Sequence, residues 1–92
     1  MRKHADWLSQ ADERILEFIS DRGNHPPKAI RDKLAEEGVQ MDYHVQHVRR
    51  ECRKLRDHGL LVDVGGGTYS ITEKGEAFLE GDLDAGTLEP EE

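Results

Sequence analysis

Gly65-Gly66-Gly67 separates two short runs of β-forming residues, and no other part of the chain has a pattern that predicts strands. Leu60–Val64 precedes the glycines, and the alternating run Thr68–Thr72 follows them, as expected of the two arms of a hairpin. Most of the 92 residues must therefore be helix or loop. The predicted fold class is α+β, with much more helix than strand.

Two helices are predicted in the first part of the chain. Apolar residues at spacings of three and four predict the first helix over residues 7–19. Ser9 and Asp12 are alternative N-caps, and Gly23-Asn24 suits a left-handed C-terminal cap. A second, short helix is expected over residues 27–37, because the proline at its start lacks an N–H that a first helical turn does not need.

A third helix precedes the hairpin and a fourth follows it. The third is expected to run from Asp42, its predicted N-cap, to about His58-Gly59. Its narrow apolar stripe consists of Val45, Val48, Cys52 and Leu55. Thr72 is the predicted N-cap of a short fourth helix. The predicted order is therefore three helices, a two-stranded hairpin and a last short helix.

The formal net charge of −7 is unevenly distributed along the chain. Residues 80–92 contain six acidic residues and no lysine or arginine, which leaves 14 acidic and 13 basic residues in residues 1–79. Residues 81–92 also have few large apolar side chains. We therefore expect residues 81–92 to form an acidic, disordered tail and residues 6–80 to form the folded domain.

Length and composition disfavour several other classes of protein. No apolar stretch approaches the roughly 18 residues needed to cross a bilayer. The charged N-terminus is unlike a secretory signal, so a cytoplasmic location is expected. The single cysteine, Cys52, cannot form an internal disulfide. No serine lies in a recognisable nucleophile motif, and enzymatic activity is not expected.

A metal site is geometrically conceivable on the third helix. His44, His47 and Glu51 are spaced by three and four residues and so share one helical face. A closed site needs about four ligands, and no further ligand is evident in the sequence. DNA contact or simple solvation explains these side chains better, and no metal or cofactor is predicted.

Several elements together resemble the winged helix-turn-helix transcription regulators. Residues 48–61 end in Leu-x-x-x-Gly-Leu-Leu, which resembles the junction between a recognition helix and the first strand of a wing. Residues 68–75 resemble the second wing strand, with its Tyr-x-Ile-Thr-x-x-Gly continuation into a helix. Residues 11–18, with Gly23-Asn24 and Pro27, are similar to small haloarchaeal proteins of the halophage phi-H repressor-like, MarR-like family.

The resemblance covers residues 6–80 and implies a function. Such a protein would be a sequence-specific regulator of transcription, a repressor, that binds double-stranded DNA as a homodimer. The first helix with Trp7 and the last helix around Phe78 are alternative dimer interfaces. A haloarchaeal origin would fit the acidic composition, since molar salt shortens the Debye length to about 3 Å and screens repulsion from DNA.

The net charge, the uncharged glycines of the wing and the acidic tail also motivate a different function. The alternative is a winged-helix module that binds another protein and has no specific affinity for DNA. A third possibility, a sensor of a small-molecule effector, would need a pocket at a dimer interface, and no residues argue for it.

The candidate DNA-binding residues lie on the third helix and at the start of the second. The third helix is the only net-basic element, with +2 over residues 42–58. Arginine can bind guanine bidentately, and glutamine can bind adenine in the same way. A solvated charged face is the simpler interpretation of such a stripe, but its place in a helix-turn-helix favours DNA. The candidates on or just before this helix are Tyr43, His44, Gln46, His47, Arg49, Arg50 and Arg53.

Two further candidates would contact phosphate. Lys28 and Arg31 lie on the first turn of the second helix, and helix N-termini favour anions. The tip of the wing, by contrast, has Asp63 and three glycines where an arginine or lysine would be expected. A basic contact from the wing to the minor groove is therefore not predicted.

Overall fold

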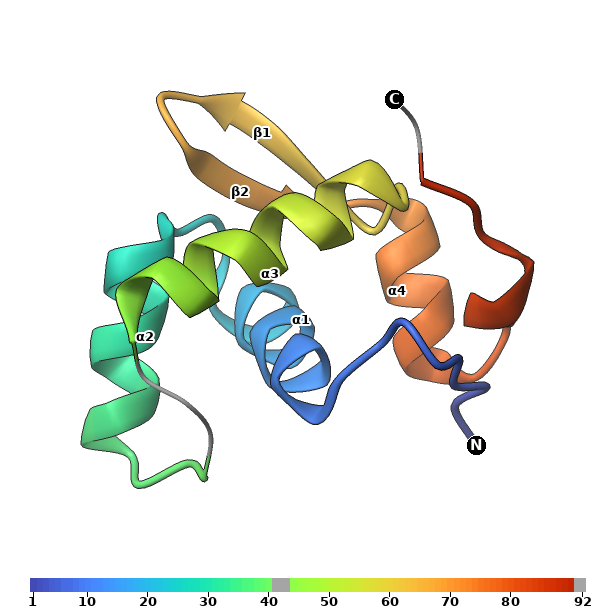
Figure 1. Ribbon diagram of the computed structural model, residues 1–92, viewed down its shortest axis with the longest axis horizontal. Coiled ribbons are helices and arrows are strands. Elements are labelled where there is room, and N and C mark those ends of the chain that lie inside the picture. The colour runs from blue at the N-terminus through green and yellow to red at the C-terminus, as the bar shows by residue number, and fades with distance from the viewer. Residues whose placement is uncertain (41–43, 91–92) are drawn as a thin grey trace.

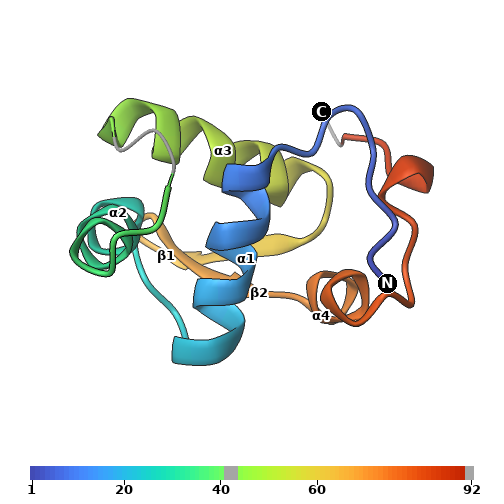
Figure 2. The same ribbon diagram turned by 90° about the horizontal axis from the view of Figure 1, so that it is seen from below.

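The structure is a computed structural model that describes residues 1–40 and 44–90 (Figure 1). Its elements are α1 (Gln10–Arg22), α2 (Pro27–Glu36), α3 (Val45–Asp57), β1 (Leu61–Gly65), β2 (Thr68–Ile71), α4 (Glu73–Glu80) and the 3-10 turn η1 (Ala85–Thr87). The predicted element order and mostly helical α+β class are confirmed. α1 occupies the centre, with α2, α3 and the hairpin around one end of the molecule and α4 at the other (Figure 2).

Of the two alternative N-caps predicted for the first helix, the structure uses Ser9, and Asp12 is the third helical residue of the same capping box. Ser9 is the N-cap, and its Oγ accepts a hydrogen bond from the Asp12 N–H at 3.2 Å. Asp12 Oδ2 in turn accepts from the Ser9 N–H at 2.8 Å. The helix therefore begins at Gln10, three residues later than the apolar pattern predicts, and ends at Arg22. Its C-cap is Gly23, whose φ of 89° and ψ of −167° lie outside the left-handed helical region predicted for this cap.

The third helix begins later than predicted. The expected cap, Asp42, lies outside the described residues. The helix starts at Val45, and His44 is its N-cap, with ring nitrogen Nδ1 accepting from the Gln46 N–H at 3.3 Å. The cap of the fourth helix is confirmed: Thr72 Oγ1 accepts from the Gly75 N–H at 3.1 Å.

β1 and β2 form the antiparallel hairpin, here called the wing (residues 61–71). Leu61 pairs with Ile71 and Asp63 with Tyr69. The three turn glycines all have positive φ, at 137°, 60° and 84°, which residues with side chains rarely adopt. Tyr69 also pairs with His25 through two backbone hydrogen bonds of 3.2 and 3.0 Å. This bridge fixes the wing to the connection between α1 and α2.

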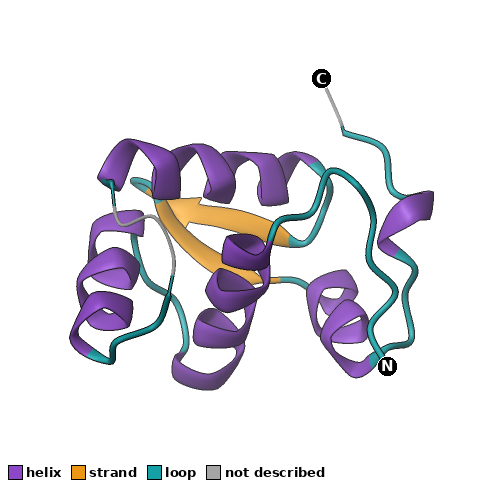
Figure 3. Ribbon diagram, turned by 60° about the horizontal axis from the view of Figure 1, so that its bottom comes forward, coloured by secondary structure: helices purple, strands orange, loops and turns teal. Residues whose placement is uncertain are grey.

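Residues 81–90 differ from the disordered tail expected there. Ala85 is fully buried, and the Trp7 Nε1–H donates to its carbonyl oxygen at 3.0 Å. Leu83 and Leu88 pack against the core. Figure 3 shows this segment beside the N-terminal residues, where Lys3 forms an isolated bridge with residue 84. Trp7 and Lys3, which bind this segment, come from the opposite end of the chain.

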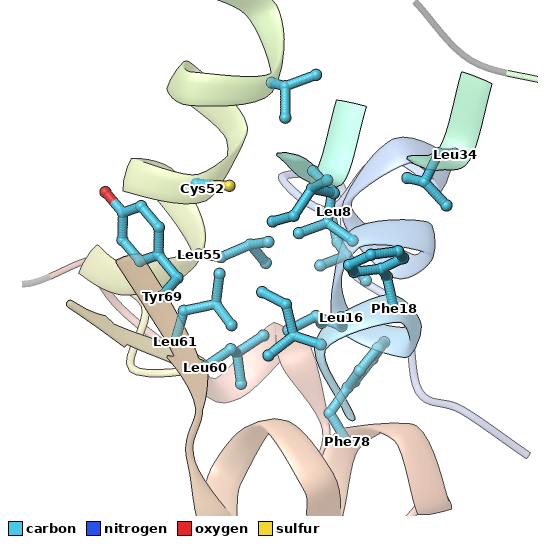
Figure 4. Packing of buried hydrophobic residues seen from close by; sticks show 14 of the residues in the cluster. Leu8, Leu16, Phe18, Leu34, Cys52, Leu55, Leu60, Leu61, Tyr69 and Phe78 are labelled. Atoms are coloured by element: carbon cyan, nitrogen blue, oxygen red, sulfur yellow. The ribbon is translucent and has the colours of Figure 1, made fainter. Parts of the chain in front are cut away.

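The core lies between α1, α3, the wing and α4 (Figure 4). Its largest fully buried apolar side chains are those of Phe78, Ile15, Leu16, Ile19, Ile30, Leu55, Leu60, Leu61 and Val48. Cys52 is also fully buried, as predicted, and burial raises the pKa of its thiol to about 12. Val45, expected to face inward, is only half-buried at the first turn of α3.

Candidate nucleic-acid interface

α3 has one buried face and one exposed face. Val48, Cys52 and Leu55 pack into the core. The exposed side carries four polar side chains, named here the α3 face: Gln46, Arg49, Arg50 and Arg53. A side chain every 100° or so around a helix puts these four on the side opposite the apolar stripe. The burial pattern confirms the predicted outward position of these four side chains, whereas His47, also expected to face outward, is half-buried.

The arginines of the α3 face differ from the other arginines of the chain. Five of the eight arginines form ion pairs with carboxylates: Arg2, Arg14, Arg22, Arg31 and Arg56. Within residues 1–40 and 44–90, no carboxylate lies within ion-pair distance of the guanidinium groups of Arg49, Arg50 and Arg53. Their donors are thus available to phosphate or to the edges of bases, which guanidinium groups bind bidentately.

A groove of about 240 Å³ lies between α3, the start of α2 and the wing turn. Its lining residues are Pro26, Pro27, Lys28, Arg49, Arg53, Gly66, Gly67 and Tyr69. Three of these side chains are cationic and none is acidic. Lys28 is the second residue of α2, where the positive end of the helix dipole adds to its charge. The groove is chemically suited to an anion.

The wing turn contributes no cation to this groove. Asp63 Oδ1 accepts hydrogen bonds from the Gly65 N–H at 2.8 Å and from the Gly67 N–H at 3.3 Å. These two backbone donors are therefore hydrogen-bonded within the turn, to the side chain of an acidic residue.

The remaining sequence candidates lie in other environments. Arg31 Nε is 2.6 Å from Asp32 Oδ1, and Arg31 does not line the groove. His47 is half-buried, with Nδ1 3.8 Å from Glu51 Oε1, and exposed His44 caps α3. Tyr43 lies outside the described residues. The structure thus brings Lys28, Arg49 and Arg53 together, with Gln46 and Arg50 beside them on the α3 face.

Sequence reasoning missed a buried charged group between α1 and α3, named here the Lys54 cluster: Asp12, Glu51 and Lys54. Lys54 Nζ lies 2.8 Å from Asp12 Oδ2 and 2.6 Å from Glu51 Oε2. Asp12 is fully buried and Glu51 is 7% exposed. The spacing of Glu51 and Lys54 by three residues could have indicated a pair, but only the folded chain brings Asp12 to it.

The two carboxyl groups of this cluster have opposite pKa shifts. Burial raises the pKa of Asp12 to about 7, and its hydrogen bond with Glu51 adds to the rise, while Lys54 and the Ser9 N–H oppose it. Burial also opposes ionisation of Glu51, but hydrogen bonds with Asp12 and Lys54 outweigh it and hold the Glu51 pKa below its ordinary value. Close to pH 7 the Asp12 carboxyl is therefore about half protonated, while Glu51 is ionised.

Neither a metal site nor a membrane-spanning helix emerges from the described part of the chain. Residues 1–40 and 44–90 contain no group of three His, Cys, Asp or Glu side chains placed to hold a metal ion. None of the helices in these ranges is both long and apolar enough to cross a bilayer.

Helices α2 and α3 pack together as a helix-turn-helix, and the wing follows α3 directly, so the fold is that of a winged helix-turn-helix domain. The chain belongs to the winged helix-turn-helix phage repressor family, whose model matches residues 1–91. Its fold is similar to the crystal structure of the PhiH1 repressor-like protein from Haloarcula marismortui, with a TM-score of 0.85 and 39% identity over 98% of this chain and 97% of that chain. No curated protein matches the chain. Fold and family are those of DNA-binding regulators and not of an enzyme class.

Proposed function

We propose that this protein binds specific sites in double-stranded DNA and represses transcription from them. The observation that carries the proposal is the set of three arginines on the α3 face that have no carboxylate partner in the described residues. An α-helix fits the major groove, where arginine discriminates guanine and glutamine discriminates adenine. In this arrangement Arg50 and Gln46 read bases.

The groove beside the α3 face supports the same proposal. Lys28, Arg49 and Arg53 line it from two elements, without an acidic neighbour in the lining. A backbone phosphate of the DNA placed there would meet three cations and the start of a helix. Phosphate contacts of this kind fix the register of the recognition helix, and base contacts then supply sequence specificity.

A homodimer and a haloarchaeal cytoplasm complete the proposal. Two copies related by a two-fold axis would bind a palindrome with half-sites roughly 34 Å apart. Phe78 is fully buried in its own chain, so an interface around that side chain is disfavoured, and α1 with half-buried Trp7 is the better candidate. The excess of acidic residues supports a high-salt origin, and the similar PhiH1 repressor-like protein comes from Haloarcula marismortui.

Selection of binding sites from a random pool of duplex DNA at molar salt tests the proposal. We expect a palindromic consensus. The Gln46→Ala/Arg50→Ala variant should lose at least tenfold in affinity for it, since each bidentate base contact is worth roughly 1–3 kcal/mol. Gln10→Ala/Arg22→Ala is a matched control, because it removes the same residue types from exposed positions on α1.

Two results would contradict the proposal in different ways. Unchanged affinity of the Gln46→Ala/Arg50→Ala variant would show that another surface reads the DNA. Failure of the wild-type chain to enrich any sequence would favour the alternative function, a winged-helix module that binds protein.

A further inference from the structure

Lys54 is paired with carboxyl groups inside the fold, whereas the arginines of the α3 face are exposed to solvent. Arg49, Arg50 and Arg53 are exposed, whereas Lys54 reaches across to Asp12 on α1 and to Glu51 on its own helix. Its side chain is only 29% exposed, and both of its partners are buried. Although it lies on the basic helix, Lys54 is thus engaged within the fold.

The carboxylate that Lys54 meets on α1 is held in a fixed position. Asp12 Oδ2 accepts from the Ser9 N–H at 2.8 Å as part of the capping box at the start of α1. The same oxygen lies 2.8 Å from Lys54 Nζ. The ammonium therefore connects the first turn of α1 to α3 through short, directional contacts.

Among the described residues, Lys54–Asp12 is the one ion pair between α1 and α3, and apolar contacts have little directional preference. Close packing of Val48, Cys52 and Leu55 restricts rotation of α3 through shape alone, and the Lys54–Asp12 contact adds a directional restraint. At about 100° per residue, Lys54 and Glu51 lie on one flank of α3, and Arg49 lies toward the other flank, at the groove. A rotation would therefore move Arg49 relative to Lys28 and the wing turn, which line the same groove.

We propose that Lys54 is a positioning residue for DNA recognition, which fixes the rotation of α3 by bridging Asp12 and Glu51. This inference rests on the proposed function of the α3 face. Lys54 does not itself contact DNA in this arrangement. It sets the direction in which Arg49, Arg50 and Gln46 point, and so acts on discrimination between sequences more than on general affinity.

Several other groups face the Lys54 cluster and share its electrostatics. His47 lies 3.8 Å from Glu51 on α3, and the Trp7 ring centroid lies 5.9 Å from Lys54 Nζ. His58 stacks on Trp7 with ring centroids 3.7 Å apart. Because Trp7 is the single tryptophan of the chain, its fluorescence reports directly on this cluster.

The test compares Lys54→Met with Lys54→Arg, which keeps a cation able to bridge two carboxylates. Lys74→Met is the matched control, since it removes one exposed positive charge from α4. Residual dipolar couplings of backbone amides give the orientation of α3 relative to α1 without any DNA. We expect a changed or averaged orientation in Lys54→Met, with a shift of Trp7 emission, and the wild-type orientation in Lys54→Arg and Lys74→Met.

DNA binding is measured on the same folded variants at molar salt, with the selected consensus duplex and a scrambled duplex of equal length. The ratio of the two affinities should fall about tenfold in Lys54→Met and change less than threefold in the other two variants. An unchanged α3 orientation in Lys54→Met would overturn the inference whatever the DNA result. A changed orientation with an unchanged affinity ratio would overturn it too. Absence of DNA binding by the wild-type chain would instead overturn the proposed function, and with it the role of Lys54 in recognition.

Discussion

The exposed sides of α1 and α3 both carry arginines, but in opposite electrostatic situations. Arg14 on α1 pairs with Glu17, and Arg22 pairs with Glu37 of the segment after α2. The two carboxylates of α3 itself form ion pairs with other cations: Glu51 pairs with Lys54, and Asp57 pairs with Arg56. The three arginines of the α3 face are left without acidic neighbours in the described residues.

Whether the cations are already paired with carboxylates, and not how many cations there are, therefore separates a solvated face from a candidate binding face. Exposed ion pairs contribute only about 0–1 kcal/mol to stability, so the pairs on α1 matter little for folding. They matter for binding, because an arginine that already has a carboxylate partner must give it up to bind phosphate. The net charge of −7 is for the same reason a poor guide to whether one surface can hold DNA.

The largest expected effect tests this contrast directly. Replacing Arg49 and Arg53 by alanine should lower DNA affinity by about 3–6 kcal/mol, roughly 10²-fold to 10⁴-fold, if each arginine makes a charge-assisted hydrogen bond to phosphate worth about 1.5–3 kcal/mol. The control Arg14→Ala/Arg22→Ala removes two paired arginines and should change affinity less than threefold. Fluorescence anisotropy with a labelled duplex measures both. Equal losses of DNA affinity in the two double variants would contradict the difference drawn between paired and unpaired arginines.

The next prediction concerns stability on the side of the molecule away from the α3 face. Truncation after Gly81 removes buried Ala85, half-buried Leu83 and Leu88 and the hydrogen-bond acceptor of Trp7. We expect a loss of about 3 kcal/mol in the free energy of unfolding, measured with urea. Truncation after Leu88 is the control and should change stability little. The same loss of stability in both would show that the packed segment stabilises nothing.

A smaller effect follows from the raised pKa of Asp12. Because its folded pKa of about 7 exceeds the unfolded value, its contribution to stability is complete below about pH 4 and is lost as pH rises through 7. Asp12→Asn keeps an acceptor for the Ser9 N–H but cannot ionise. The stability of the wild type relative to this variant should therefore fall between about pH 4 and about pH 7 and then level off.

Urea unfolding at several pH values measures this difference. The two proteins differ only at residue 12, so the difference in stability between wild type and Asp12→Asn isolates the Asp12 carboxyl. Parallel stability curves would contradict a proton held by the Lys54 cluster near neutrality.

The smallest predicted effect concerns the capping box at the start of α1. Ser9→Ala removes one of the two hydrogen bonds of the capping box, the one from the Asp12 N–H to Ser9 Oγ. It should cost about 1 kcal/mol of unfolding free energy. DNA affinity should stay within threefold of wild type, because the Asp12–Lys54 contact persists. Ser20→Ala, at an exposed position inside α1, is a matched control with little expected effect. A loss of DNA affinity in folded Ser9→Ala would show that the cap itself helps to position α3.

Local signals explain why the element order was predictable from the sequence. The helical stripes, the glycine turn and the Thr72 cap each depend on residues a few positions apart. The His44 cap was missed because an imidazole nitrogen is outside the usual set of N-cap acceptors. Arg31 was a reasonable phosphate candidate, but its neighbour Asp32 takes its guanidinium.

The features that the sequence did not indicate depend on contacts between distant residues. Glu51 is buried although it is charged, because Lys54 pairs with its carboxylate. Lys54 also pairs with Asp12, which is on another helix. The segment around Ala85 packs because Trp7 supplies a ring and a donor from 78 positions away. Patterns within a window of ten or twenty residues contain no information about either arrangement.

The hydrogen bond between Trp7 and Ala85 also sets a minimum time for folding on the ribosome. The donor is synthesised 78 residues before its acceptor. At translation rates of about 5–20 residues per second, the side chain of Trp7 waits roughly 4–16 s for its partner to be made. Trp7 can therefore form this contact only after residue 85 has been synthesised. Trp7 is also the fluorophore whose emission would report formation of this contact.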